Sequence, residues 1–100
     1  MKDPSHLLTI SVIGGASPTD EIKGLAYLVG KSLARLGVTL VSGGLAGVME
    51  ASCKGAKEEG GTTIGILPGS NPAEANPYVD FKICTGLGFA RNPIVVRSGL

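Results

Sequence analysis

The stretch that decides the fold is Leu7-Leu8-Thr9-Ile10-Ser11-Val12-Ile13, which is followed at once by Gly14-Gly15. Apolar residues occupy both alternating positions of this run, which is typical of a parallel strand covered on both faces. The next residues carry the signals of a helix start, with Ser17 as the N-cap and Pro18 at the first helical position. A strand, a glycine turn and a helix are therefore expected to open the chain.

The same order of strand, turn and helix then recurs. The expected elements are a helix over residues 18–36, a strand over 38–41, a helix over 47–59, a strand over 62–67, an edge strand over 79–83 and a short connecting helix within 87–97. Because parallel neighbours require crossover helices, this order predicts an α/β fold with a Rossmann-like, doubly wound parallel sheet. We expect a truncated sheet of three or four strands in a single domain, residues 1–100.

Composition excludes several classes of partner. The net charge is +1 and no basic run occurs, so neither DNA nor RNA is expected to bind, because neutralising phosphates needs clustered Lys and Arg. The polar first residues and short apolar runs predict neither a signal peptide nor a membrane span. A cytoplasmic location is expected, with Cys53 and Cys84 as buried reduced thiols and no metal site.

Two glycine turns carry the predicted ligand chemistry. They consist of Gly14, Gly15, Ala16 and Ser17 in the first turn and of Ser42, Gly43, Gly44 and Gly47 in the second. Each turn follows a strand and precedes a helix, where unpaired N–H groups and the positive end of the helix dipole attract phosphate. We therefore predict that both turns bind the phosphate of a nucleotide-like ligand. The alternative is that the glycines serve only tight turns and close packing.

Standard nucleotide motifs fit the sequence poorly. The second turn approaches G-x-G-x-x-G, with Ser42 in place of the first glycine, but no acidic residue follows the third strand to hold a ribose 2′-OH. A standard NAD site is therefore disfavoured. Lys31-Ser32 lies within the first helix and at the wrong spacing for a P-loop.

Arg91 is the most informative single charge. It follows Thr85-Gly86 beyond the end of a strand, where a guanidinium is able to bind a phosphate bidentately. Thr85, Gly86 and Arg91 therefore join the predicted phosphate or nucleotide site, although a solvated surface arginine is the alternative. Glu50 and His6 are better explained by helix-dipole stabilisation and by solvent exposure than by catalysis.

Several ordered motifs resemble one family. They are Ser42-Gly43-Gly44, residues 47–51, 64–69 and 76–80, and residues 85–88 with Ala90-Arg91-Asn92. Together they look like the Rossmann-like group once misannotated as lysine decarboxylases. That group includes the LOG cytokinin-activating phosphoribohydrolases and the molybdenum-cofactor carrier proteins, and the resemblance is closest to the carrier branch. It implies a homo-oligomeric fold that binds a nucleotide or a molybdopterin-type cofactor.

The resemblance also implies what this sequence lacks. In LOG members an arginine and a glutamate cleave the N-glycosidic bond of a nucleoside 5′-monophosphate, and Arg91 matches that arginine by position. The glutamate belongs to a downstream P-G-G-x-G-T-x-x-E motif that is absent here. We therefore expect the N-terminal portion of the family fold, with residues 7–13 left as a long, uncovered apolar edge. Self-association or pairing with a complementing second half would follow.

Three functions stay open at this stage. The favoured one is carrier-like binding of a nucleotide or a phosphate-bearing cofactor through the glycine turns. The second is a LOG-like hydrolase completed by another chain, with Arg91 as a catalytic residue. The third is a structural or interaction fragment without a ligand.

Overall fold

The computed structural model describes residues 8–99 as a four-stranded sheet with flanking helices. The elements are β1 (Thr9–Ser11), α1 (Asp20–Arg35), β2 (Thr39–Ser42), α2 (Val48–Glu58), β3 (Thr63–Leu67), β4 (Phe81–Cys84) and α3 (Asn92–Arg97), with short 3-10 turns η2 (Pro72–Glu74) and η3 (Gly88–Arg91). The strand order is β1-β2-β3-β4 and every neighbouring pair is parallel. The predicted α/β, Rossmann-like sheet is confirmed, and it has four strands.

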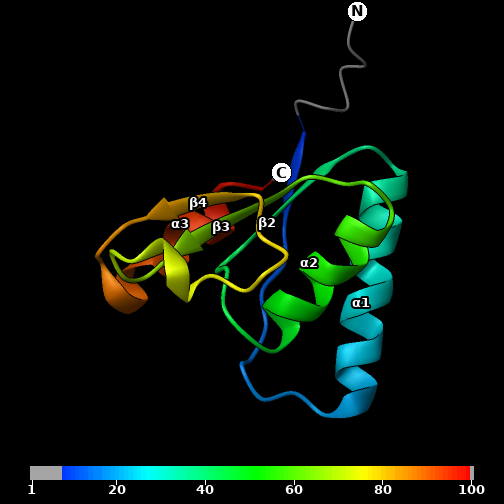
Figure 1. Ribbon diagram of the computed structural model, residues 1–100, viewed down its shortest axis with the longest axis horizontal. Helices are drawn as coiled ribbons and strands as arrows, with labels where there is room; N and C mark the ends of the chain where they lie inside the picture. The colour runs from blue at the N-terminus through cyan, green and yellow to red at the C-terminus, as the bar shows by residue number, and fades with distance from the viewer. Residues whose placement is uncertain (1–7, 100) are drawn as a thin grey trace, which may run out of the picture.

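Helices cover both faces of the sheet (Figure 1). Neighbouring residues of β2 point to opposite faces, so each supports a different core. Leu40 packs with Leu33 and Cys53 beneath α1 and α2, whereas Val41 packs with Ile66 and Val95 beneath α3. This arrangement is the doubly wound architecture that the sequence predicts.

β1 lies at the edge of the sheet but differs from the expected strand. The strand comprises Thr9–Ser11, and backbone hydrogen bonds to β2 extend it to Leu8 and Val12, whereas the expected run was 7–13, of which Leu7 lies outside the described residues. The Thr9 hydroxyl donates a hydrogen bond to the Ser98 carbonyl, and the Ser11 hydroxyl donates one to the Val95 carbonyl. The strand is therefore shorter than expected and its polar side chains attach one face to α3, but its predicted position at the edge of the sheet is confirmed.

The start of α1 also differs from the prediction. Thr19 is the N-cap, and its Oγ1 accepts a hydrogen bond from the Ile22 amide at 3.2 Å. The predicted cap at Ser17 is therefore wrong. A cap at Thr19 places Asp20 and Glu21 in the first turn, where the positive end of the helix dipole favours carboxylates.

The last elements of the chain confirm the predicted edge strand and the predicted short helix. β4 is the second edge strand, and the ambiguous tail forms η3 followed by the short helix α3, with Pro93 in its first turn.

Cys53 is fully buried, and this burial raises the pKa of its thiol. Cys84 is exposed, so its predicted burial is wrong, because β4 has no neighbouring strand on its outer side within residues 8–99.

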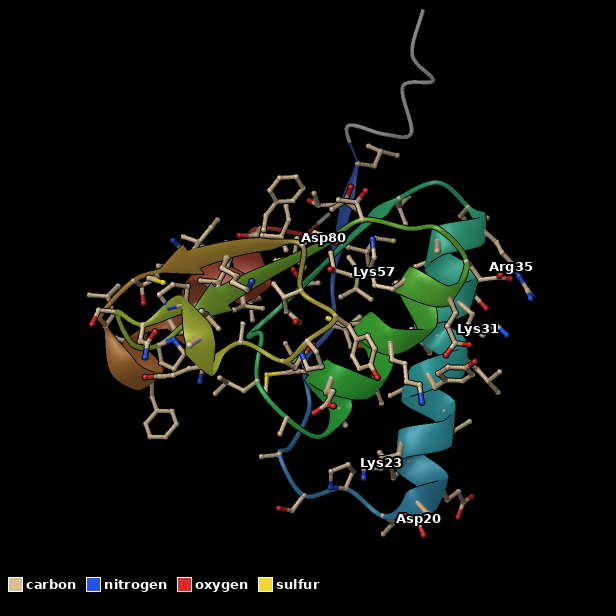
Figure 2. All side chains as sticks on the ribbon, viewed as in Figure 1. Asp20, Lys23, Lys31, Arg35, Lys57 and Asp80 are labelled. Carbon is tan, nitrogen blue, oxygen red and sulfur yellow. The ribbon has the colours of Figure 1, made fainter. Side chains whose placement is uncertain are left out.

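Charged side chains hold the loop before β4 against α2. Lys57 Nζ lies 2.8 Å from Asp80 Oδ2, and the Thr63 amide donates to the same carboxylate at 3.0 Å (Figure 2). Desolvation alone would raise the pKa of Asp80, but the hydrogen bonds from Lys57 and Thr63 keep it below its ordinary value.

No helix within residues 8–99 has the length and apolar character needed to cross a membrane.

The contact between α1 and α2 depends on two glycines. A Cβ at Gly30 would overlap the Ser52 carbonyl oxygen, and a Cβ at Gly55 would overlap the Tyr27 carbonyl oxygen. The two backbones therefore approach more closely than any side chain allows.

We predict that Gly30→Ala destabilises the chain although alanine is the better helix former. Overpacking costs about 1–3 kcal/mol, which exceeds the roughly 1 kcal/mol that alanine gains within a helix. Gly24→Ala is the matched control, because Gly24 lies in the same helix and a Cβ added to it would have nothing within 4 Å, so it should stabilise the chain. Urea unfolding of both variants tests this, and equal stabilisation would contradict the close contact.

Candidate functional site

A cavity of about 400 Å³ lies where the carboxyl ends of β1 and β2 meet the start of α3. Its lining residues are Val12, Ile13, Gly14, Ala16, Gly43, Leu45, Met49, Phe89, Arg91, Asn92, Val95 and Val96. The wall is mainly apolar, and Arg91 is the one charged residue that residues 8–99 contribute to it. This size and composition are typical of a small-molecule site, and the carboxyl ends of the strands are where open α/β sheets bind ligands.

Arg91 ends η3 and is buried, with only 6% of its surface exposed. Its Nε donates to the Ile66 carbonyl oxygen at 2.9 Å. The guanidinium fills the space beside Gly43, where a Cβ would lie 2.6 Å from Nη2. Gly43 is therefore the residue that leaves room for the Arg91 side chain.

The Arg91 charge has no carboxylate partner within residues 8–99. The ion pairs of that part of the chain are Arg35–Glu59 and Lys57–Asp80, both away from the cavity. Burial lowers the pKa of Arg91, but a guanidinium still remains protonated at neutral pH. A buried cation without a compensating anion is costly, so this geometry favours an anionic ligand.

The two glycine turns contact each other at the same edge of the sheet. The Val48 amide, which begins α2, donates to the Gly15 carbonyl oxygen at 3.1 Å. Gly47 has a φ of 75°, and a Cβ there would lie 2.6 Å from the Ala16 carbonyl carbon. The amide that begins α2 is thus already engaged, and so is that of Gly44, one of the predicted phosphate-binding residues, which donates to Ser42 Oγ at 3.1 Å.

The start of α1 does not lie at the first glycine turn, where the sequence predicts that its amides would bind phosphate. It begins at Asp20 (Figure 2), well after the first glycine turn, and its first turn carries the carboxylates of Asp20 and Glu21. The anion-binding group that the cavity does offer is the guanidinium of Arg91. Among the cavity-lining residues, the amides of Gly14, Ala16 and Gly43 have no hydrogen-bond partner within residues 8–99.

The structure brings four of the predicted site residues together around the cavity. These are Gly14, Ala16, Gly43 and Arg91. Gly15 and Ser17 instead line a second, apolar groove beside α1. Four of the predicted residues therefore line the candidate cavity, and their role in binding a ligand stays a prediction.

The remaining predicted residues do not line the cavity. They are Ser42, Gly44, Gly47, Thr85 and Gly86. Ser42 is fully buried with its Oγ 3.6 Å from Cys53 Sγ, and Thr85 Oγ1 donates to the Leu67 carbonyl oxygen at 2.7 Å. Their contacts shape the turns that follow β2 and β4.

Several cavity residues are absent from the sequence prediction. Met49 lies near Gly43, where a Cβ would be 2.8 Å from its Sδ, and Phe89 is 85% exposed. Asn92, Val95 and Val96 come from α3. The position of Met49 just after the second glycine turn is the one sequence signal that could have indicated it.

The candidate acids and bases do not enter the cavity. Glu50 lies in the first turn of α2 but does not line the cavity, and none of the lining residues within residues 8–99 is Asp or Glu. The prediction that His6 is solvent-exposed lies outside the described residues.

The sheet order and this cavity define the chain as a Rossmann-like α/β protein with a cavity at the carboxyl ends of its strands. A model of the SLOG cluster 4 family matches residues 7–99, and the chain belongs to this family. The resemblance to the LOG-related, Rossmann-like group is thereby confirmed.

Solved structures of related proteins share the fold. The molybdenum cofactor binding protein of Rippkaea orientalis has a TM-score of 0.89 and 42% identity, covering 92% of this chain and 58% of its own. The molybdenum cofactor carrier protein of Chlamydomonas reinhardtii has a TM-score of 0.82 and 42% identity, with the same coverage of 92% and 58%.

An uncharacterised protein of Archaeoglobus fulgidus is 46% identical over 92 residues, which are 92% of this chain and 60% of that protein. The chain therefore spans about three fifths of the length of these relatives.

Proposed function

We propose that the chain binds a phosphate-bearing, molybdopterin-type cofactor in a carrier-like role. The observation that carries this proposal is the buried guanidinium of Arg91, which lies in an apolar cavity without a carboxylate partner among residues 8–99. A phosphate would supply the missing negative charge and accept charge-assisted hydrogen bonds from the guanidinium.

The rest of the cavity fits the organic part of such a cofactor. Met49, Leu45 and Val95 offer apolar contact to a flat heterocycle, and the volume of about 400 Å³ lies within the usual range for small ligands. No Cys, His, Asp or Glu is among the lining residues within 8–99, so these residues would hold the pterin and its phosphate and leave the metal unligated by protein. The metal would be carried as cargo.

The related structures support the same ligand class. Both solved relatives are named for the molybdenum cofactor that they bind or carry, and each is 42% identical to this chain over 92% of it. The glycine turns alone predict a nucleotide. A nucleotide and a pterin cofactor both join a flat ring to a phosphate, so the two ligands would make the same kinds of contact with this cavity.

A LOG-like hydrolase is less well supported by the described residues. Cleavage of an N-glycosidic bond needs acid assistance or charge stabilisation at the departing base and sugar. Arg91 is placed to bind the phosphate of such a substrate, but no carboxylate lines the cavity within residues 8–99. Hydrolysis would require an acidic group from outside residues 8–99.

Ligand-dependent thermal unfolding tests the proposal. Molybdenum cofactor released from a molybdoenzyme should raise the unfolding temperature, and ligand at 100 times its Kd would contribute about 2.7 kcal/mol. Adenosine 5′-monophosphate should stabilise the chain more than adenosine, because adenosine lacks the phosphate. Absence of any shift at millimolar ligand would favour an interaction fragment, and release of adenine from the monophosphate would favour the hydrolase.

A further inference from the structure

Asn76 is a buried polar residue in the loop that joins β3 to β4, and only 6% of its surface is exposed. Its backbone amide donates to the Gly44 carbonyl oxygen at 2.8 Å, and its side-chain Nδ2 donates to the Leu45 carbonyl oxygen at 2.8 Å. Its Oδ1 accepts a third hydrogen bond, from the Tyr78 amide at 3.0 Å. One residue therefore connects two consecutive carbonyl groups of the second glycine turn to the loop before β4.

The loop that carries Asn76 is itself held in place by β3 and α2. Thr63 Oγ1 donates to the Tyr78 carbonyl oxygen at 2.6 Å and accepts a hydrogen bond from the Asp80 amide at 2.9 Å. The ion pair between Lys57 and Asp80 adds a contact with α2. Asn76 therefore binds the glycine turn from a fixed position.

The turn that Asn76 holds forms part of the cavity wall. Gly43 and Leu45, on either side of Gly44, line the cavity, whereas Asn76 does not. The C=O and N–H groups of a trans peptide point in opposite directions, so the bond from Asn76 to the Gly44 carbonyl directs the Leu45 amide away from Asn76. The Leu45 amide has no hydrogen-bond partner within residues 8–99.

The turn needs support because Gly43 and Gly44 are adjacent glycines, which have more backbone freedom than other residues. A binding site keeps its geometry when the groups that form it are held by hydrogen bonds from behind. We infer that Asn76 is a positioning residue that fixes the second glycine turn as a wall of the cavity and thereby sets the affinity for a phosphate-bearing ligand. The effect on affinity rests on the proposed function, whereas the effect on the turn does not.

Two substitutions at Asn76 separate its contacts. Asn76→Ala loses both side-chain hydrogen bonds, whereas Asn76→Asp retains the acceptor for the Tyr78 amide and loses only the donor to the Leu45 carbonyl. Each should weaken binding of adenosine 5′-monophosphate by about tenfold in calorimetric titration. Asn71→Ala is the matched control, because Asn71 lies in the same loop and its Oδ1 accepts from the Ala73 amide instead of contacting the turn, so the affinity should not change.

Amide hydrogen exchange separates positioning from a general loss of stability. In both ligand-free Asn76 variants the Gly44 amide, which donates to Ser42 Oγ, should exchange about tenfold faster relative to the buried amides of α1. A general loss of stability would speed exchange in the turn and in α1 by the same factor. In the unmodified chain, adenosine 5′-monophosphate should slow exchange of the Asn76 amide more than that of the α1 amides, because coupling between two sites is reciprocal.

Two results would overturn the inference. One is a folded Asn76→Asp variant that binds adenosine 5′-monophosphate as tightly as Asn71→Ala does. The other is exchange of the Gly44 amide that changes only as much as exchange in α1. If neither Asn76 variant folds, exchange of the Asn76 amide in the unmodified chain decides, and no slowing by bound ligand contradicts the inference. If the unmodified chain binds no ligand, the proposed function fails, and exchange at Gly44 still shows whether Asn76 fixes the turn.

Discussion

Replacing Arg91 with methionine should weaken binding of a phosphate-bearing ligand by roughly 10- to 150-fold while the fold is retained. The range corresponds to the loss of one charge-assisted hydrogen bond, which is worth about 1.5–3 kcal/mol. Methionine preserves an apolar stem but removes the guanidinium beside Gly43, which is the only charge that the described residues place on the cavity wall. Calorimetric titration with molybdenum cofactor, and separately with adenosine 5′-monophosphate, measures the change.

In the absence of ligand, the same substitution is expected to maintain or raise the stability of the chain, although it weakens ligand binding. Removing a buried cation that lacks a carboxylate partner within residues 8–99 relieves its desolvation, so the ligand-free variant should be at least as stable as the original chain. The hydrogen bond from Arg91 to the Ile66 carbonyl oxygen is lost and offsets part of this gain. If Arg91 had only a structural role, Arg91→Met would lower the free energy of unfolding and leave the affinity for the ligand unchanged.

Two controls separate the charge from its geometry. Arg35→Met removes an arginine that is paired with Glu59 and 64% exposed, so ligand affinity should not change. Arg91→Lys retains the charge but not the planar fork of donors, so its affinity should lie between those of the original chain and Arg91→Met. Unchanged affinity in Arg91→Met would exclude the proposed phosphate contact.

The sequence predicts the sheet well because its signals are local. Each strand is a short β-rich run that ends at a turn, and Gly37 and Gly60 end helices with positive φ angles that glycine readily adopts. The cap of α1 is harder to predict, because Ser17 and Thr19 are chemically similar caps separated by one proline. Which of the two residues caps the helix depends on where its first turn begins.

The site is predicted less completely because its walls come from distant segments. Gly43 and Arg91 are recognisable one at a time, but their contact depends on how η3 returns to the end of β2. The sequence also gives no sign that the Val48 amide is engaged by the Gly15 carbonyl oxygen. A helix start that appears free in the sequence is therefore partly satisfied by the neighbouring turn.

Gly47→Ala should be the most destabilising small substitution in the two turns, at about 2–6 kcal/mol. Gly47 combines a φ of 75° with a ψ of −128°, a region where side chains are strained by about 1–3 kcal/mol. Its Cβ would also lie against the backbone of Ala16, and relieving that overlap costs about 1–3 kcal/mol more. Urea unfolding measures the loss, which is a large fraction of the stability of a small domain.

Gly60→Ala isolates the backbone term. Gly60 has a similar φ of 72° with nothing within 4 Å of its Cβ position, so its cost should be only about 1–2 kcal/mol. The difference between the two variants then reports the contact between the glycine turns, and Gly47→Ala should also weaken ligand binding because Gly14 and Ala16 line the cavity. Equal losses of stability would mean that the first turn yields freely, and it would then be too mobile to form a wall of the cavity beside Arg91.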